Sequence, residues 1–143
     1  MAVDARRLKT VEKVFGLEAA AVLLADLLPP WMLELSLKPG NEAGFTALMT
    51  EMVAATSANE AGALSYEWSL SCDGATCHIF ERYADSAAVL THLGTFGERF
   101  AGRFLEMLTP TRCVVYGSPS PQVKEGLAVL NPVYMRLVGG FNR

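Results

Sequence analysis

Hydrophobic and polar residues alternate without interruption between residues 64 and 72. The residues that share the apolar side are Leu64, Tyr66, Trp68, Leu70 and Cys72. A period of two predicts a β-strand with one well-buried face, because successive side chains of a strand point to opposite sides. Asp73-Gly74 follows and is typical of a hairpin turn, so residues 77–83 are expected to return as the second strand of a hairpin.

Two other segments show helical spacing. Over residues 45–53, apolar side chains recur at positions i, i+3, i+4, i+7 and i+8, which predicts a helix over about residues 41–57. A second helix is expected to begin at Asp85 or Ser86 and to be interrupted at Gly94, after which a capping-box spacing restarts it.

The remaining strands complete a known order of elements. Residues 31–40 form a short alternating run closed by a Pro-Gly pair, and residues 111–117 supply a fourth strand. The order strand–helix–strand–strand–helix–strand predicts a ferredoxin-like α+β fold with an antiparallel sheet. We divide the chain into an N-terminal helical extension at 1–30, this domain at 31–118, and a C-terminal extension at 119–143.

Both extensions contain apolar segments. In the first, basic residues precede the apolar run 14–28, which two acidic residues interrupt. This run is expected to form a helix that lies on the domain, with a targeting segment or a translation start at Met32 as alternatives. In the second, a short helix is expected over 123–130, and the apolar residues 131–141 are expected to pack on the domain or on a partner.

Both faces of the strand at 77–83 carry large side chains. His78 and Phe80 lie on one face. The opposite face carries Cys77, Ile79, Glu81 and Tyr83. Two helices can cover one face of a four-stranded sheet, but a chain of this size cannot cover the second face by itself. A second copy can, so we expect a homodimer whose sheets pack face to face.

Composition and charge restrict the classes of partner. Of the 143 residues, 51% are hydrophobic and 19% are charged, which is typical of a globular protein. The net charge is −3 and no block of like charges occurs, so neither nucleic acid nor a membrane is an expected partner. The run 14–28 is shorter than the roughly 20 residues that span a bilayer. An odd number of cysteines favours a reducing cytoplasm.

A candidate metal or redox site lies at the hairpin tip, where Cys72, Cys77 and His78 are close in sequence. Cys72 and Cys77 end and begin the two paired strands and could face each other across the hairpin, either as inert thiols or as a disulfide where the geometry allows. A zinc site needs further ligands, no second Cys/His pair exists, and His78 points away from Cys77. We therefore predict inert hairpin cysteines and no metal site, and we assign Cys113 to the core.

A resemblance to a known family adds to this interpretation. The order of elements, the Pro-Gly pair after the first strand and the segment ERYADSAAVLTH at 81–92 together resemble the antibiotic biosynthesis monooxygenase domain. The resemblance covers about residues 31–117. It implies a small dimeric α+β barrel. Family members include oxygenases of quinols or polycyclic aromatics that use neither metal nor flavin, and a branch that degrades haem.

The resemblance also implies roles for individual residues. His92 matches a family histidine that faces a pocket between the sheet and the helices, so it is the candidate catalytic base. Glu81 is expected to orient or tune a neighbouring group. Aromatic walls would orient a flat substrate by stacking. The side chains assigned to these walls are Phe45, Tyr66, Trp68, Tyr83, Phe96 and Phe100.

The predicted activity needs no cofactor. Tyr83 stands where the haem branch usually has a tryptophan, and Leu33 stands where it has an asparagine, so haem degradation is not expected. The prediction is an oxygenase that deprotonates a small phenol or quinol and holds the anion beside dioxygen. Two alternatives stay open, a non-catalytic module that binds a small molecule and a structural partner in a larger assembly, because fold does not fix function.

Overall fold

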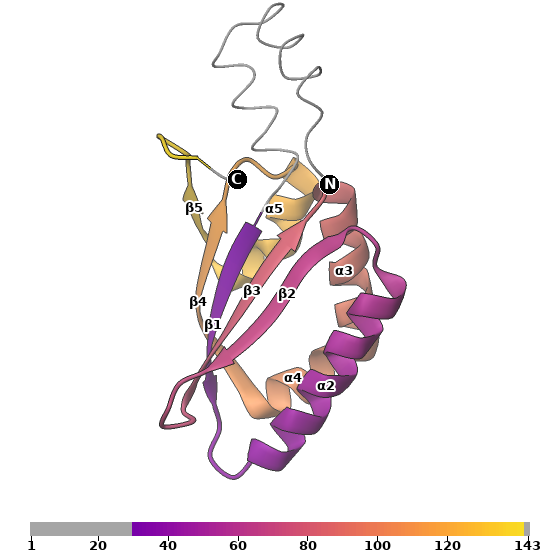
Figure 1. The fold of residues 1–143 in the computed structure, drawn as a ribbon, viewed down its shortest axis with the longest axis vertical. Coiled ribbons are helices and arrows are strands. Elements are labelled where there is room, and N and C mark those ends of the chain that lie inside the picture. Colours follow the sequence, from indigo (N-terminus) through magenta and orange to yellow (C-terminus); the bar gives the residue numbers. More distant parts are fainter. Residues whose placement is uncertain (1–29, 142–143) are drawn as a thin grey trace, which may run out of the picture.

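The computed structural model describes residues 30–141, in which a layer of helices covers one side of a five-stranded sheet (Figure 1). The elements are β1 (Pro30–Leu37), α2 (Glu42–Asn59), β2 (Ala63–Leu70), β3 (Thr76–Tyr83), α3 (Ser86–Arg99), α4 (Ala101–Met107), β4 (Leu108–Tyr116), α5 (Pro121–Leu127), the 3-10 helix η1 (Ala128–Leu130) and β5 (Val133–Met135). The strand order is β2-β3-β1-β4-β5; strands β1 to β4 pair antiparallel with one another, and β5 pairs parallel with β4. This topology confirms the predicted ferredoxin-like α+β fold.

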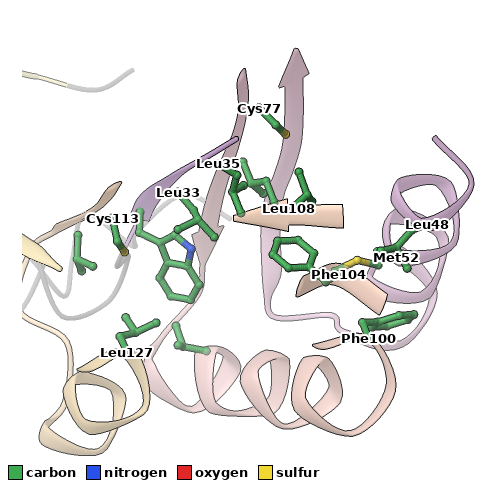
Figure 2. Close-up of a cluster of buried hydrophobic side chains, with 14 of the residues drawn as sticks. Leu33, Leu35, Leu48, Met52, Cys77, Phe100, Phe104, Leu108, Cys113 and Leu127 are labelled. Atoms are coloured by element: carbon green, nitrogen blue, oxygen red, sulfur yellow. The ribbon is translucent and has the colours of Figure 1, made fainter. Parts of the chain in front are cut away.

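The core lies between the central strand β1 and the helices. Every second residue of β1 is buried on the helix side, namely Trp31, Leu33, Leu35 and Leu37. These side chains join Met52 of α2 and Phe104 of α4 in one contiguous cluster (Figure 2). Removing this apolar surface from water is the main stabilising contribution to the fold.

The second helical segment breaks at a different residue from the predicted one. Asp85 caps α3 as expected, because its side chain accepts a hydrogen bond from the Ala88 backbone N–H. The helix then runs through Gly94, and the break falls at Phe100, where φ is −122°. Phe100 is buried in the core. Tertiary packing of this aromatic ring, rather than the local flexibility of glycine, therefore places the break.

Strand β2 lies at an edge of the sheet, which reduces the burial predicted for it. Leu64 is 38% exposed and Leu70 is 48% exposed, and a β-bulge interrupts the pairing between Ala63 and Ser65. Ala63, Tyr66 and Trp68 are the partly buried residues of β2 that pack against the core. The alternating pattern predicted the strand correctly but overstated its buried face, because alternation does not distinguish an edge strand from a central one.

The C-terminal part of the chain contains one strand more than predicted. β4 begins at Leu108 rather than residue 111, and β5 pairs parallel with β4 at the edge of the sheet. The predicted tail helix is present as α5 followed by η1. Leu137 and Val138 are 70% and 87% exposed in the single chain, so their packing on a partner stays a prediction. Within residues 30–141, no helix is both long and apolar enough to cross a bilayer.

The structure does not describe the helix predicted for residues 14–28, which lies outside residues 30–141. The proposed division into extensions at 1–30 and 119–143 around a domain at 31–118 stays a prediction.

Cys72 and Cys77 do not face each other, which removes the possibility of a disulfide across the hairpin. The hairpin register pairs Cys77 with Leu70, so Cys72 lies in the turn and is exposed, whereas Cys77 is buried. The strand ends before the alternation in the sequence does. Cys113 is buried in the core as predicted. Among residues 30–141, no three His, Cys, Asp or Glu side chains form a group that could hold a metal ion.

The three cysteines should differ in reactivity. Burial raises the pKa of Cys77 and of Cys113 to about 11, so few of these thiols are ionised at neutral pH. We expect iodoacetamide to label Cys72 in the native protein and the other two only after unfolding, as measured by intact mass over time. Cys72→Ser is the control and should abolish native labelling. A disulfide between Cys72 and Cys77 formed without unfolding would contradict the register.

Gly62 and Gly94 should respond in opposite ways to substitution by alanine. A Cβ on Gly62 would lie 2.5 Å from the Cβ of Ala88, whereas one on Gly94 meets nothing within 4 Å. We expect Gly62→Ala to lower the free energy of unfolding by about 1–3 kcal/mol through overpacking. Gly94→Ala should raise it by about 0.5–1 kcal/mol, because glycine is a poor helix former. Urea denaturation measures both, and shifts of the same sign would contradict the packing described.

Candidate functional site

A cavity lies between the helix-covered side of the sheet and the helices. Its empty space is about 410 Å³, part of it at an open mouth. The residues that line it are Trp31, Leu33, Met52, Tyr66, Ile79, Glu81, His92, Leu93, Phe96, Phe104, Leu127 and Leu130. An apolar wall with a few convergent polar groups is the usual form of a small-molecule site. Here the convergent groups belong to Tyr66, Glu81 and His92.

His92 is held on the buried face of α3. It follows the fully buried Val89 by three residues, so both share the side of the helix that meets the sheet. Its Nδ1 lies 2.7 Å from Oε2 of Glu60, and both side chains are almost fully buried. A carboxylate can only accept a hydrogen bond, so this contact places a proton on Nδ1. In the neutral imidazole, Nε2 then keeps the lone pair that acts as a base.

Glu60 was not found by sequence reasoning. It directly follows α2, where its backbone N–H donates to the carbonyl of Thr56 and its side chain is buried against α3. Residues 59–62 have the local pattern of a polar turn, and that pattern does not indicate which helix the turn meets. One signal was present: a histidine on a buried helix face requires a polar partner, and a carboxylate at the end of a neighbouring helix can supply it.

Glu81 and Tyr83 point to the same buried face of β3. The Tyr83 hydroxyl donates a hydrogen bond to Oε2 of Glu81. Burial raises the pKa of Glu81, and the charge of Glu60 acts in the same direction, whereas His92 and Tyr83 oppose it. Burial also raises the pKa of Tyr83, so this phenol stays a donor. Glu81 therefore keeps its proton at pH values at which an exposed glutamate has lost it.

A gap separates the two polar groups that face the cavity. Nε2 of His92 lies 3.6 Å from Oε2 of Glu81, just beyond hydrogen-bonding distance. A hydroxyl oxygen on the cavity side of this pair, off the line that joins the two atoms, would be within reach of both the base and the protonated carboxyl. The rings of Tyr66 and Tyr83 lie 5.3 and 5.4 Å from the imidazole, so aromatic walls enclose the base.

The structure brings together some of the predicted site residues and not others. Those that line the cavity are Tyr66, Glu81, His92 and Phe96. Those that do not line it are Phe45, Trp68, Tyr83 and Phe100.

Each of the four residues outside the lining has another structural position. Tyr83 contacts the site residues from behind the lining, through its hydrogen bond to Glu81 and its ring contact with His92. Trp68 stacks edge-on against Tyr66 at 5.8 Å and packs against Phe45, which is in the core. Phe100 is buried at the break between α3 and α4. Their helical or alternating spacing correctly predicted burial, but spacing alone does not separate a cavity wall from the core.

Comparison with known proteins identifies the family of this site. Residues 32–102 match the family model of the antibiotic biosynthesis monooxygenases. This part of the chain belongs to the antibiotic biosynthesis monooxygenase family. The match confirms the resemblance seen in the segment 81–92, and it contains Glu60, Glu81 and His92. No curated protein matches the sequence.

Solved structures share the fold of this family domain. MupZ from Pseudomonas fluorescens aligns with a TM-score of 0.72 and 24% identity over 81% of this chain and 94% of its own. Rv0793 from Mycobacterium tuberculosis aligns with a TM-score of 0.56 and 25% identity over 65% of this chain and 96% of its own. PA3566 from Pseudomonas aeruginosa aligns with a TM-score of 0.55 and 21% identity over 66% of this chain and 96% of its own. These likenesses concern the fold, so the function is argued from the site.

Proposed function

We propose that this protein is a cofactor-independent oxygenase of the antibiotic biosynthesis monooxygenase type that acts on a compact phenol or quinol. One observation carries the proposal: His92 lines the cavity while buried Glu60 holds its Nδ1 at 2.7 Å. A histidine oriented in this way is suited to act as a general base. The family match over residues 32–102 supports an oxygenase-like reaction.

The proposed reaction begins with proton transfer. The substrate hydroxyl lies beside His92 and Glu81 on the cavity side, and Nε2 of His92 accepts its proton. Protonated Glu81 donates a hydrogen bond to the phenolate oxygen that forms, which stabilises the developing charge. Glu60 stabilises the imidazolium through the hydrogen bond from Nδ1.

The substrate then supplies the electrons for dioxygen. The electron-rich ring carbon of the phenolate forms a bond to O2, and the outer peroxide oxygen takes back the proton that His92 had accepted, which gives a hydroperoxide. Its O–O bond breaks with loss of the ring proton and release of water, which leaves a quinone carbonyl. One oxygen atom of O2 ends in the quinone and the other in water. The substrate gives up four electrons in total. Two of them reduce the oxygen atom that ends in the quinone and two reduce the one that ends in water, so no external reductant is required.

The apolar surroundings support this chemistry. Leu33, Ile79 and Phe96 line the cavity beside the polar groups, so little water surrounds the anion and its interactions with the site are strong. The 410 Å³ of empty space includes open solvent at the mouth, and the cavity itself has a volume of only about 60 Å³, which is small for a ligand site. This size favours a compact ring system over a polycyclic one.

One observation favours a second candidate, a binding module without turnover. The polar groups of the site are already paired with each other, His92 with Glu60 and Glu81 with Tyr83. A buried polar network that satisfies itself is also found where the role is structural. In this case the cavity would bind a small aromatic molecule and leave it unchanged.

We also propose that the protein forms a homodimer through the uncovered face of the sheet. Phe80 on β3 is 39% exposed there, and it pairs in register with Met32 of β1. This uncovered face is apolar at Met32 and Phe80 and polar at Glu34 and His78, a mixture that suits a two-fold contact with a second copy. Analytical ultracentrifugation measures the mass, and a monomer at micromolar concentration would contradict the proposal.

The cytoplasm is the proposed location, since the chain has an odd number of cysteines.

The test of the oxygenase is oxygen uptake by the purified full-length protein with monocyclic quinols and phenols, with and without a metal chelator. We expect uptake above the spontaneous rate, unchanged by the chelator, with quinone formed in proportion to the oxygen consumed. Calorimetric binding of these compounds without any uptake would overturn the oxygenase and leave the binding module. Uptake that the chelator abolishes would overturn the claim that no metal is needed.

A further inference from the structure

The C-terminal extension forms part of the cavity wall. Leu127, at the end of α5, and Leu130, in η1, both line the cavity, although the family match ends at residue 102. Figure 2 shows Leu127 on the same side of Leu33 as Cys113, with Phe104 on the other side. One boundary of the cavity therefore comes from a segment beyond the family match.

The start of α5 is attached to the domain. The backbone N–H of Ser120 donates to the hydroxyl oxygen of Ser86, in the first turn of α3, at 3.0 Å. Val123 of α5 is fully buried. Gly126 passes so close to α3 that a Cβ on it would lie 3.0 Å from Cδ1 of Leu93. Because Leu93 also lines the cavity, α5 and this part of the wall pack as one unit.

A second attachment follows η1. Asn131 adopts a left-handed conformation with φ of 46°, and the chain then enters β5. Strand β5 pairs in parallel with Val114–Tyr116 of β4, and the backbone N–H of Gly117 donates to the carbonyl of Met135 at 2.9 Å. Leu127 and Leu130 are therefore held between two attachments to the domain.

We infer that Leu127 and Leu130 set the largest ring system that the cavity accepts. The inference rests on the proposed function only in taking the cavity as the site of a phenolic ligand, with the hydroxyl at His92 and Glu81. With the hydroxyl fixed there, the ring must lie among the apolar lining. Branched side chains that are held from both sides cannot withdraw without moving α5, and packed interiors resist such displacement. A second fused ring needs space that these leucines occupy.

The test compares the binding of phenol and of 1-naphthol, which carry the same hydroxyl on one ring and on two fused rings. Leu130→Ala replaces an isobutyl group by a methyl group, so 1-naphthol should bind more tightly by about tenfold or more, with a smaller change for phenol. Leu130→Phe adds volume and should weaken the binding of 1-naphthol more than that of phenol. Isothermal titration calorimetry under nitrogen, with the full-length protein, measures all the dissociation constants.

Val129→Ala is the matched control. Val129 lies between the two leucines in sequence, is 90% exposed and is absent from the cavity lining, so its truncation should change neither affinity. Leu127→Ala tests the same wall a second time, with circular dichroism to confirm folding because Leu127 is buried in the core. Leu130 is only partly buried, so the Leu130 variants keep the inference testable if Leu127→Ala does not fold.

The outcomes separate this inference from the proposed activity. An unchanged ratio of the two affinities in Leu130→Ala would overturn the inference, and so would an equal change in Val129→Ala. Absence of binding by any form of the protein would also overturn it, since the cavity would then hold no phenol. A size-dependent change in binding without oxygen uptake refutes the oxygenase and keeps the inference. Oxygen uptake together with an unchanged ratio of the two affinities supports the oxygenase and refutes the inference.

Discussion

Replacing His92 with glutamine is expected to lower kcat for oxygen uptake by roughly 10²–10⁴-fold, the range that a general base contributes. Glutamine is chosen because its amide N–H can still donate to Glu60, so no buried carboxylate is left without a partner. It has no lone pair basic enough to accept a proton from a phenol. The loss should therefore appear in kcat, while the affinity for phenol, measured by calorimetry, changes little.

The chain provides a matched control for this variant. It has two histidines, and the second, His78, lies on the opposite face of β3, where its Nε2 is 3.2 Å from Oε2 of Glu34. His78→Gln should leave kcat unchanged. An active His92→Gln variant would show that His92 is a structural residue and that the proton is removed elsewhere. An equal loss in both variants would point to damage to the fold or to the proposed dimer.

Local patterns in the sequence predicted most of the fold because each element carries its own signal. Alternation marked the hairpin, Asp85 marked the start of α3, and helical spacing marked α2. The errors lie where a distant contact decides the outcome. The hairpin register excludes Cys72 from the strand, and the burial of Phe100 moves the helix break away from Gly94. Neither contact is encoded in the neighbouring residues.

The site was predicted less completely for the same physical reason. The family segment 81–92 indicated Glu81 and His92, which share the cavity because β3 and α3 are consecutive elements that pack together. Glu60 reaches His92 across 32 residues of sequence, and Leu130 reaches the cavity from beyond β4. A polar turn and an apolar tail have these positions only in the folded chain, so their chemistry is visible only in three dimensions.

Replacing Glu81 with glutamine is expected to stabilise the protein at neutral pH by an amount that increases as the pH rises. Burial raises the pKa of the folded-state carboxyl above the unfolded reference of 4.5. Below pH 4.5 both states carry the proton, and the group has no effect. Above it, the unfolded chain loses the proton first, which favours unfolding by up to about 1.4 kcal/mol per pH unit until the folded carboxyl also ionises. Glutamine does not ionise and avoids this loss.

Urea denaturation between pH 4.5 and 8.5 measures the difference between the two proteins. Their free energies of unfolding should be closest at the acidic end, because glutamine can still accept a hydrogen bond from Tyr83. They should diverge as the pH rises, because only glutamate ionises. Glu106→Gln removes an exposed carboxyl on α4 and should run parallel to the wild type. A Glu81→Gln curve that is also parallel would mean that Glu81 is ionised in the fold. In that case Glu81 could not donate a hydrogen bond to the phenolate, and the ion pair would favour a protonated His92 that cannot act as the base.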